Sequence, residues 1–160
     1  MLIQSEVCNW KLLNLNLTST IIRGEVEMKQ KRIYVTKIFS FEAAHKLIHY
    51  EGTCQNLHGH SYELEVTISG SINDRGIVLD FKDLKMIVNN AVVDRLDHSY
   101  LNDVFDFEDT TAENIISFIW DELRNALQEK HNAANNLCLE RVRLYETKTC
   151  YVEINRENEL

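Results

Sequence analysis

The sequence predicts an α+β fold in which helices pack against an antiparallel sheet. Two strand-like segments come first, two helical segments follow, and two further strand-like segments close the chain, an order typical of this class. At 160 residues the chain fits one domain. Hydrophobic residues make up 44% and charged residues 26%, which suits an ordinary packed core and does not indicate disorder.

The strands are predicted from their side-chain patterns. Residues 33–41 are rich in β-branched and aromatic side chains, which favour strands. Over residues 61–68 apolar and polar side chains alternate strictly, so that one face of the strand is buried and the other is not. Three further strands are predicted at residues 77–79, 139–145 and 150–154.

Two helices are predicted between the strand pairs. Asp80 can cap the first helix. The second helix is expected to begin near Thr110 or Thr111, where Thr110 with Glu113 forms a capping-box pattern. Residues 132–136 are expected to end the second helix. Each helix has one apolar stripe at helical spacing, made of Leu84, Ile87, Val88, Ala91 and Val92 in the first and of Ile116, Ile119, Trp120, Leu123 and Leu127 in the second.

Residues 1–27 stand apart as an N-terminal extension, and residues 28–160 form the single predicted domain. Lys11 interrupts the apolar residues of the extension, so the segment is not a convincing signal peptide. Residues 23–27, directly before Met28, can be encoded by purine-rich codons that resemble a bacterial ribosome-binding site. The resulting hypothesis is that Met28 is the natural start and that the extension is not native.

Charge and cysteine usage restrict the classes of partner and compartment. A net charge of −8 argues against a general nucleic-acid or anionic-membrane surface. No apolar run reaches the roughly 18 residues that a membrane-spanning helix needs. The four cysteines form no CxxC pair, and with no secretion signal visible the simplest interpretation is free thiols in a reducing cytoplasm.

Three histidines can converge on one metal ion. His58 and His60 are two apart at the start of a predicted strand, so both imidazoles point the same way. His45 follows the preceding strand and completes a three-histidine face if the two strands are neighbours. Three neutral imidazoles suit Zn²⁺ and leave a fourth position open, as in catalytic zinc sites. Chance spacing of surface or core histidines is the competing interpretation.

Further polar residues have both a functional and an ordinary interpretation. Cys54, beside the histidines, is a catalytic candidate or the fourth ligand of a closed structural zinc site. Asp97 next to His98 can form an acid–base pair, although such neighbours are more often simple loop residues. Glu146 is expected in a turn facing water, or as a carboxylate that binds the N–H and NH₂ edge of a guanine-like ring.

Six segments together resemble the 6-pyruvoyl-tetrahydropterin synthase superfamily, which includes the 6-carboxy-tetrahydropterin synthases. They occur in the family's order and span about residues 33–154. The segments are FEAAH at 41–45, CQNLHGH at 54–60, GIVLDFKDLK at 76–85, LDHSYLN at 96–102, TAEN at 111–114 and YET at 145–147.

The resemblance implies a T-fold. Such subunits have a four-stranded antiparallel sheet with two helices on one face and assemble into barrels, typically two trimers that form a homohexamer with active sites at subunit contacts. Closing a ring also protects the exposed edges of an isolated sheet.

The resemblance also implies a zinc-dependent lyase that acts on 7,8-dihydroneopterin triphosphate. His45, His58 and His60 match the zinc ligands, Cys54, Asp97 and His98 the catalytic residues, and Glu146, Thr111 and Glu113 the pterin-binding residues. Three residues separate Cys54 from His58, a gap that resembles the bacterial branch making 6-carboxy-tetrahydropterin for queuosine and other 7-deazaguanines.

Three alternatives remain open at this level. The same fold can make 6-pyruvoyl-tetrahydropterin instead of the 6-carboxy product. The chain can be a zinc- or pterin-binding module without catalysis. Finally, the zinc site can be purely structural, with Cys54 as its fourth ligand.

Overall fold

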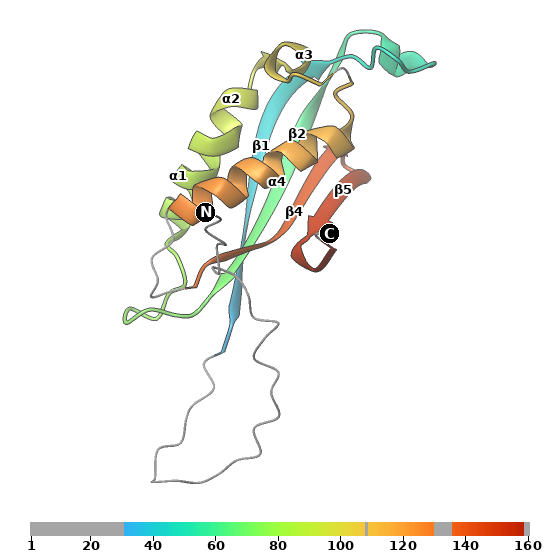
Figure 1. The fold of residues 1–160 in the computed structure, drawn as a ribbon. Coiled ribbons are helices and arrows are strands. Elements are labelled where there is room, and N and C mark those ends of the chain that lie inside the picture. Colours follow the sequence, from blue (N-terminus) through green and yellow to red (C-terminus); the bar gives the residue numbers. More distant parts are fainter. Residues whose placement is uncertain (1–30, 108, 130–135, 159–160) are drawn as a thin grey trace, which may run out of the picture.

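A computed structural model describes residues 31–107, 109–129 and 136–158. The predicted extension at residues 1–27 lies outside these ranges, as do residues 132–135 of the segment expected to end the second helix. Within the described part, five strands form one sheet whose order is β3-β1-β2-β4-β5 (Figure 1). The strands are β1 Ile33–His45, β2 His58–Gly70, β3 Ser99–Tyr100, β4 Cys138–Thr147 and β5 Cys150–Asn155.

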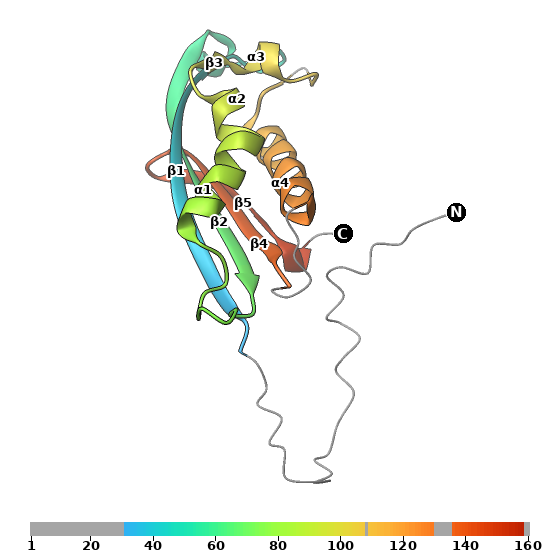
Figure 2. The ribbon, with the colours of Figure 1, turned by 90° about the vertical axis from the view of Figure 1, so that its left-hand side faces the viewer.

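The main helices lie together on one face of this sheet (Figure 2). They are α1 Phe81–Val88, the π-helical turn η3 Asn89–Val93, α2 Asp94–Leu96, α3 Leu101–Val104 and α4 Ala112–Glu129. Two short 3₁₀ turns, η2 Thr53–Gln55 and η4 Arg156–Asn158, complete the described elements. The predicted α+β class is therefore confirmed, with the helices covering one side of an open sheet.

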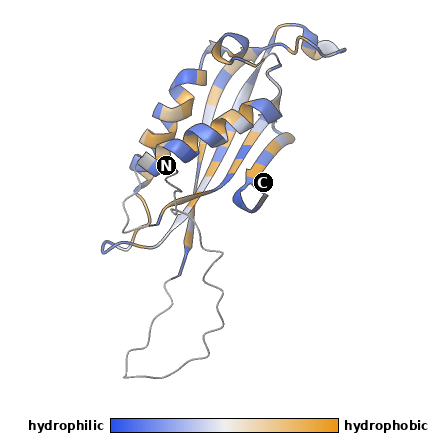
Figure 3. Cartoon of the chain, in the orientation of Figure 1, coloured by the Kyte–Doolittle hydropathy of each residue, from blue (hydrophilic) through white to orange (hydrophobic). Residues whose placement is uncertain are grey.

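The core lies between the sheet and the helices. Alternate residues of β1 and β2 point into it, including Phe41, Tyr62 and Leu64, which are at most 2% exposed. The apolar stripes predicted for the two helices supply the opposite wall, except that Ala91 is only partly buried. Figure 3 shows the resulting alternation of hydrophobic and hydrophilic residues along the helices and strands.

The long antiparallel pair β1 and β2 determines where the functional residues meet. Its register runs without interruption from Ile33 opposite Gly70 to His45 opposite His58. Because directly opposite residues in such a pair share a face, the two histidines point to the same side of the sheet. The strands extend beyond the predicted ranges, and this extra length carries both histidines into the sheet.

Two local expectations are wrong. Residues 77–79 form no strand, and residues 78 and 79 are bends, because Asn73 closes a local turn in which its side chain accepts from the N–H groups of Arg75 and Ile77. Thr111, not Thr110, caps α4: its hydroxyl accepts from the N–H of Asn114. The two-residue strand β3, which runs parallel to β1, was not expected.

Three other expectations concern the cap of α1, the cysteine thiols and membrane-spanning helices. Asp80 caps α1 by accepting from the N–H of Lys82 at 2.7 Å. Cys54 and Cys150 carry free thiols as expected, whereas this expectation is wrong for Cys138, which is disulfide-bonded. No helix in the described part of the chain is both long enough and apolar enough to cross a membrane.

Candidate metal centre

The structure brings His45, His58 and His60 together at one end of the sheet. One ligand nitrogen from each imidazole lies within 4.8 Å of the other two. His45 and His58 are cross-strand partners, and His60 lies opposite Ala43 on the same face. Gly59 permits this close pairing, since a side-chain Cβ there would lie 3.1 Å from the Ala43 carbonyl oxygen. Three strand positions therefore present three imidazoles to one point.

Two backbone carbonyl groups orient the imidazoles. Nδ1 of His45 lies 2.9 Å from the carbonyl oxygen of Thr110, and Nδ1 of His58 lies 2.8 Å from that of Asn56. A carbonyl oxygen can only accept, so both Nδ1 atoms carry the proton and both Nε2 atoms have free lone pairs. Such bonds to the far ring nitrogen are the usual support of metal-binding histidines.

Two of the ring nitrogens that face the centre of the cluster make no hydrogen bond to any described residue. Within the described residues, Nε2 of His45 and Nε2 of His60 are buried without a hydrogen bond. Burial lowers the pKa of both imidazoles, which favours the neutral form that a metal ion requires. Unpaired buried acceptors are costly unless a ligand satisfies them. The three histidines therefore fit a metal ion, and a set of neutral nitrogen donors suits Zn²⁺.

Glu146 is the acidic side chain beside this cluster. Its Oε1 lies 3.6 Å from Nε2 of His45 and 3.7 Å from Nε2 of His60. The residue belongs to β4 and not to the turn after it. The side chain remains 30% exposed, so the carboxylate lies between the histidines and the solvent.

Cys54 occupies the connection between β1 and β2, in the η2 turn. Its free thiol is partly exposed, and the metal-ligand cluster found among the described residues contains the three histidines without Cys54. This placement disfavours the closed structural site with Cys54 as the fourth ligand.

Asp97 and His98 lie at the outer edge of β1 and contact each other. Asp97 Oδ1 lies 2.9 Å from Nδ1 of His98 and accepts from the N–H of Glu42, the largest cause of a lowered pKa for the Asp97 carboxyl. The His98 side chain is 80% exposed, and its backbone adopts φ 57°. The two residues thus form an ordered pair that faces away from the body of the subunit.

The start of α4 adjoins the histidine cluster. Thr110, whose carbonyl group binds His45, is fully buried directly before the capping residue Thr111. Glu113 follows in the first turn and is exposed. Thr110 and Asn56 support the histidines through backbone carbonyl groups, which every residue carries, so no sequence signal marks them. Tyr62 lies on the same face as His60, and the centroids of the two rings are 5.5 Å apart.

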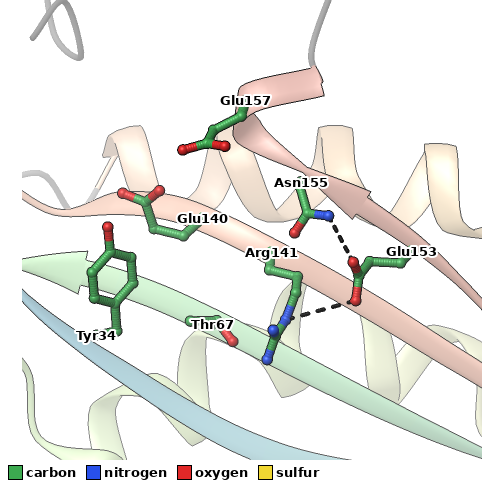
Figure 4. A pocket seen from close by; sticks show the side chains of 7 residues that line it. All are labelled: Tyr34, Thr67, Glu140, Arg141, Glu153, Asn155 and Glu157. Carbon is green, nitrogen blue, oxygen red and sulfur yellow. Dashed lines mark hydrogen bonds and ion pairs between the residues drawn. The ribbon is translucent and has the colours of Figure 1, made fainter.

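A separate cavity of about 530 Å³ lies on the helix-free face of the sheet. Figure 4 shows seven residues lining it, from β1, β2, β4, β5 and η4: Tyr34, Thr67, Glu140, Arg141, Glu153, Asn155 and Glu157. Arg141 and Asn155 both contact the Glu153 carboxylate. None of the candidate residues predicted from the sequence lines this cavity, so the histidine cluster remains the candidate site.

An α+β fold with one open sheet and a three-histidine cluster at one end of it defines a protein of the T-fold class that can hold a metal ion. The chain belongs to the 6-pyruvoyl tetrahydropterin synthase family, whose profile matches residues 34–157. It is accordingly an enzyme, a lyase of the kind represented by the named tetrahydropterin synthases of this family.

Sequence relatives extend over most of the chain. A 6-carboxy-5,6,7,8-tetrahydropterin synthase from Haemophilus influenzae is 35% identical over 143 residues, covering 74% of this chain and 96% of the relative. A 6-pyruvoyl tetrahydrobiopterin synthase from Dictyostelium discoideum is 40% identical over 116 residues, covering 70% of this chain and 83% of the relative.

Solved structures support the fold independently. The 6-pyruvoyl tetrahydropterin synthase of Caenorhabditis elegans superposes with a TM-score of 0.67 at 24% identity and covers 79% of this chain and 96% of that chain. The predicted T-fold is therefore confirmed for the single chain, except that the sheet has a fifth strand, the short β3, which is parallel to β1. Assembly into a barrel stays a prediction.

Proposed function

We propose that this chain is a zinc-dependent 6-carboxy-5,6,7,8-tetrahydropterin synthase. It would convert 7,8-dihydroneopterin triphosphate, with one water, to 6-carboxytetrahydropterin, acetaldehyde and triphosphate, as a step towards queuosine and other 7-deazaguanines in the cytoplasm. The observation that carries the proposal is the convergence of His45, His58 and His60, with Nε2 of His45 and Nε2 of His60 buried without a hydrogen bond among the described residues. The Haemophilus relative, matched over almost its whole length, supports the choice of product.

The three histidines would hold zinc, which when bound stabilises negative charge that develops on oxygens of the substrate side chain. Thr110 and Asn56 keep two of these imidazoles in the required tautomer through their carbonyl groups. Burial of His45 excludes water and keeps its ring neutral.

Glu146 would anchor the pterin ring. Its carboxylate can accept two parallel N–H bonds from the amide and amino edge of the ring. Its contact with His45 and His60 supports this role, because it places the recognition group beside the metal centre. Thr111 and Glu113 would assist from the start of α4, which is tied to His45 through Thr110.

Cys54 would act as the base that removes a proton from the substrate side chain. A thiolate near a bound cation is stabilised in its charged form. Asp97 and His98 would form the second acid–base pair: Asp97 fixes the Nδ1 side of the His98 ring and leaves Nε2 to exchange the proton.

The product assay tests this proposal directly. The zinc-loaded protein is incubated with 7,8-dihydroneopterin triphosphate, and acetaldehyde and 6-carboxytetrahydropterin are measured together. A 6-pyruvoyl product without acetaldehyde would instead identify the activity named for the Dictyostelium relative. Absence of any turnover despite bound zinc would leave a binding module without catalysis.

A hexamer of identical subunits would complete the site. β3 pairs with β1 only at Ala43 and Ala44, so residues 33–42 have no strand partner on the outer edge within the described part of the chain. Such a free edge favours pairing with another chain. Asp97 and His98 lie along this edge and face outward, which supports their donation to the site of a neighbouring subunit.

Mixed assemblies of two inactive variants are expected to regain activity. If one subunit supplies Cys54 and its neighbour supplies Asp97, random mixing of Cys54→Ala with Asp97→Ala chains restores both groups at about a quarter of head-to-tail contacts. The measurement is turnover after the two proteins are unfolded and refolded together. Each variant refolded alone is the control, and no recovery in the mixture would show that both residues act within one subunit.

A further inference from the structure

The connection between β1 and β2 is fastened by side chains that do not belong to the histidine cluster. This connection, residues 46–57, is called the Cys54 loop below. It begins directly after His45 and ends directly before His58, and these two residues are strand partners. Both ends of the loop therefore stand at the metal centre, and its path decides where the Cys54 thiol lies.

Asp109 holds the outgoing arm of the loop. Its Oδ1 accepts from the backbone N–H of Ile48 at 2.6 Å and from that of His49 at 3.1 Å. Its Oδ2 lies 3.3 Å from Nδ1 of His49. The N–H group of His49 holds the pKa of the Asp109 carboxyl below its usual value, so the acceptor is charged and its hydrogen bonds are of the stronger kind.

Asn102 holds the residue at the start of the same arm. Its Oδ1 accepts from the N–H of Lys46 at 3.0 Å, and its Nδ2 donates to the carbonyl group of Lys46 at 2.9 Å. One side-chain amide thus satisfies both polar backbone groups of Lys46, as a neighbouring strand would do. Together the two anchors secure the loop on either side of Leu47.

The secured arm is bonded to Cys54. The N–H of Leu47 donates to the carbonyl group of Cys54 at 2.9 Å. This hydrogen bond links the returning arm of the loop, which carries Cys54, to the anchored outgoing arm. Asp109 is also followed by Thr110, whose carbonyl group binds Nδ1 of His45. One short segment before α4 therefore contacts both the loop that carries the thiol and a histidine of the metal centre.

We propose that Asp109, assisted by Asn102, is a positioning residue that sets the place of the Cys54 thiol relative to the three histidines. This inference rests on the proposed function, in which Cys54 reacts with the substrate. It assigns to Asp109 a role that acts on the thiol and not on metal binding, because Cys54 lies in the anchored loop whereas the three histidines lie in β1 and β2.

The zinc-loaded Asp109→Asn protein tests this role. The change keeps the side-chain size but removes the negative charge that strengthens the bonds to Ile48 and His49, and it replaces Oδ2 by an NH₂ group, which cannot accept. Zinc content is expected to stay at the wild-type level, while kcat falls about 10²-fold with little change in KM, because a small displacement of a reacting group has an effect of this order. Asp106→Asn is the matched control, since it makes the same change at an exposed acid nearby.

Thiol reactivity supplies a readout that does not depend on turnover. Alkylation of Cys54 by iodoacetamide, followed by peptide mass spectrometry, is expected to accelerate about tenfold as the loop loosens. Cys150, an exposed free thiol in the same sample, is the internal reference. An unchanged ratio of Cys54 to Cys150 labelling, or a loss of zinc in parallel with activity, would overturn the proposal.

The test also covers a variant that does not fold and a wild-type protein without turnover. Where Asp109→Asn does not fold, as judged by circular dichroism, Asn102→Ala removes the other anchor and is judged by the same labelling and zinc measurements. Where the wild-type protein does not turn over the pterin substrate, the proposed function fails, and the labelling ratio still decides whether Asp109 holds Cys54 in place.

Discussion

The His58→Gln protein is expected to lose its bound zinc, and turnover with it, while the sheet remains folded. Glutamine cannot supply the imidazole nitrogen, and two histidines alone make a weak site. Changes to residues that only support zinc ligands already lower metal affinity by about 10–100-fold, so loss of a ligand is expected to cost more than about 100-fold. Metal content after dialysis against a chelator measures the loss, and thermal unfolding by circular dichroism measures the fold.

His58 is the suitable position for this change because of where it lies. It starts β2 and remains partly exposed, whereas His45 is 1% exposed and bonded to Thr110. His98→Gln is the matched control for zinc content, since it makes the same chemical change at a residue that lies outside the cluster and is expected to leave the bound zinc in place. Retention of zinc by His58→Gln would contradict the metal centre, and unfolding of the chain would favour a structural site.

The Cys54→Ala protein is expected to keep its zinc and to lose about 10²–10⁴-fold in kcat, the usual contribution of a positioned acid–base group. Zinc is retained because the cluster of ligand atoms consists of three histidines without this thiol. Folding is expected to be unaffected, since Cys54 lies in a partly exposed turn. Steady-state turnover and metal analysis on the same preparation measure the two effects separately.

Cys150→Ala is the control for this experiment, because Cys150 is also a free thiol but lies exposed after the turn between β4 and β5. Its turnover is expected to match the wild type. Unchanged turnover of Cys54→Ala would remove the thiol from the mechanism, and loss of zinc in that variant would revive the alternative in which Cys54 is a ligand.

The histidine centre was accessible from the sequence because it depends on strand geometry. A strand repeats every two residues, so His58 and His60 necessarily share a face. The alternating residues after them identify that face as the buried one. Only the adjacency of β1 and β2 was assumed, and the uninterrupted register of this pair confirms it.

The capping of α4 shows where a local pattern is ambiguous. Thr110 and Thr111 both stand before the helix, and either hydroxyl can serve as a cap. Packing decides between them. Thr110 is fully buried, with its carbonyl group bonded to His45, so Thr111 caps α4 by accepting from the N–H of Asn114. The failed strand at residues 77–79 has a similar cause, because the side-chain turn at Asn73 competes with strand pairing.

By itself, the sequence determined the α+β class, the order of the long strands and helices, and the three histidines with Cys54 between His45 and His58. These follow from periodicities of two and 3.6 residues and from motif spacing, which local backbone geometry dictates. Only the tertiary structure decided which carbonyl groups fix the tautomers, that Glu146 reaches the histidines from β4, and that Asp109 and Asn102 hold the Cys54 loop. Those contacts join segments far apart along the chain, and they depend on strand register and on how the helices lie over the sheet.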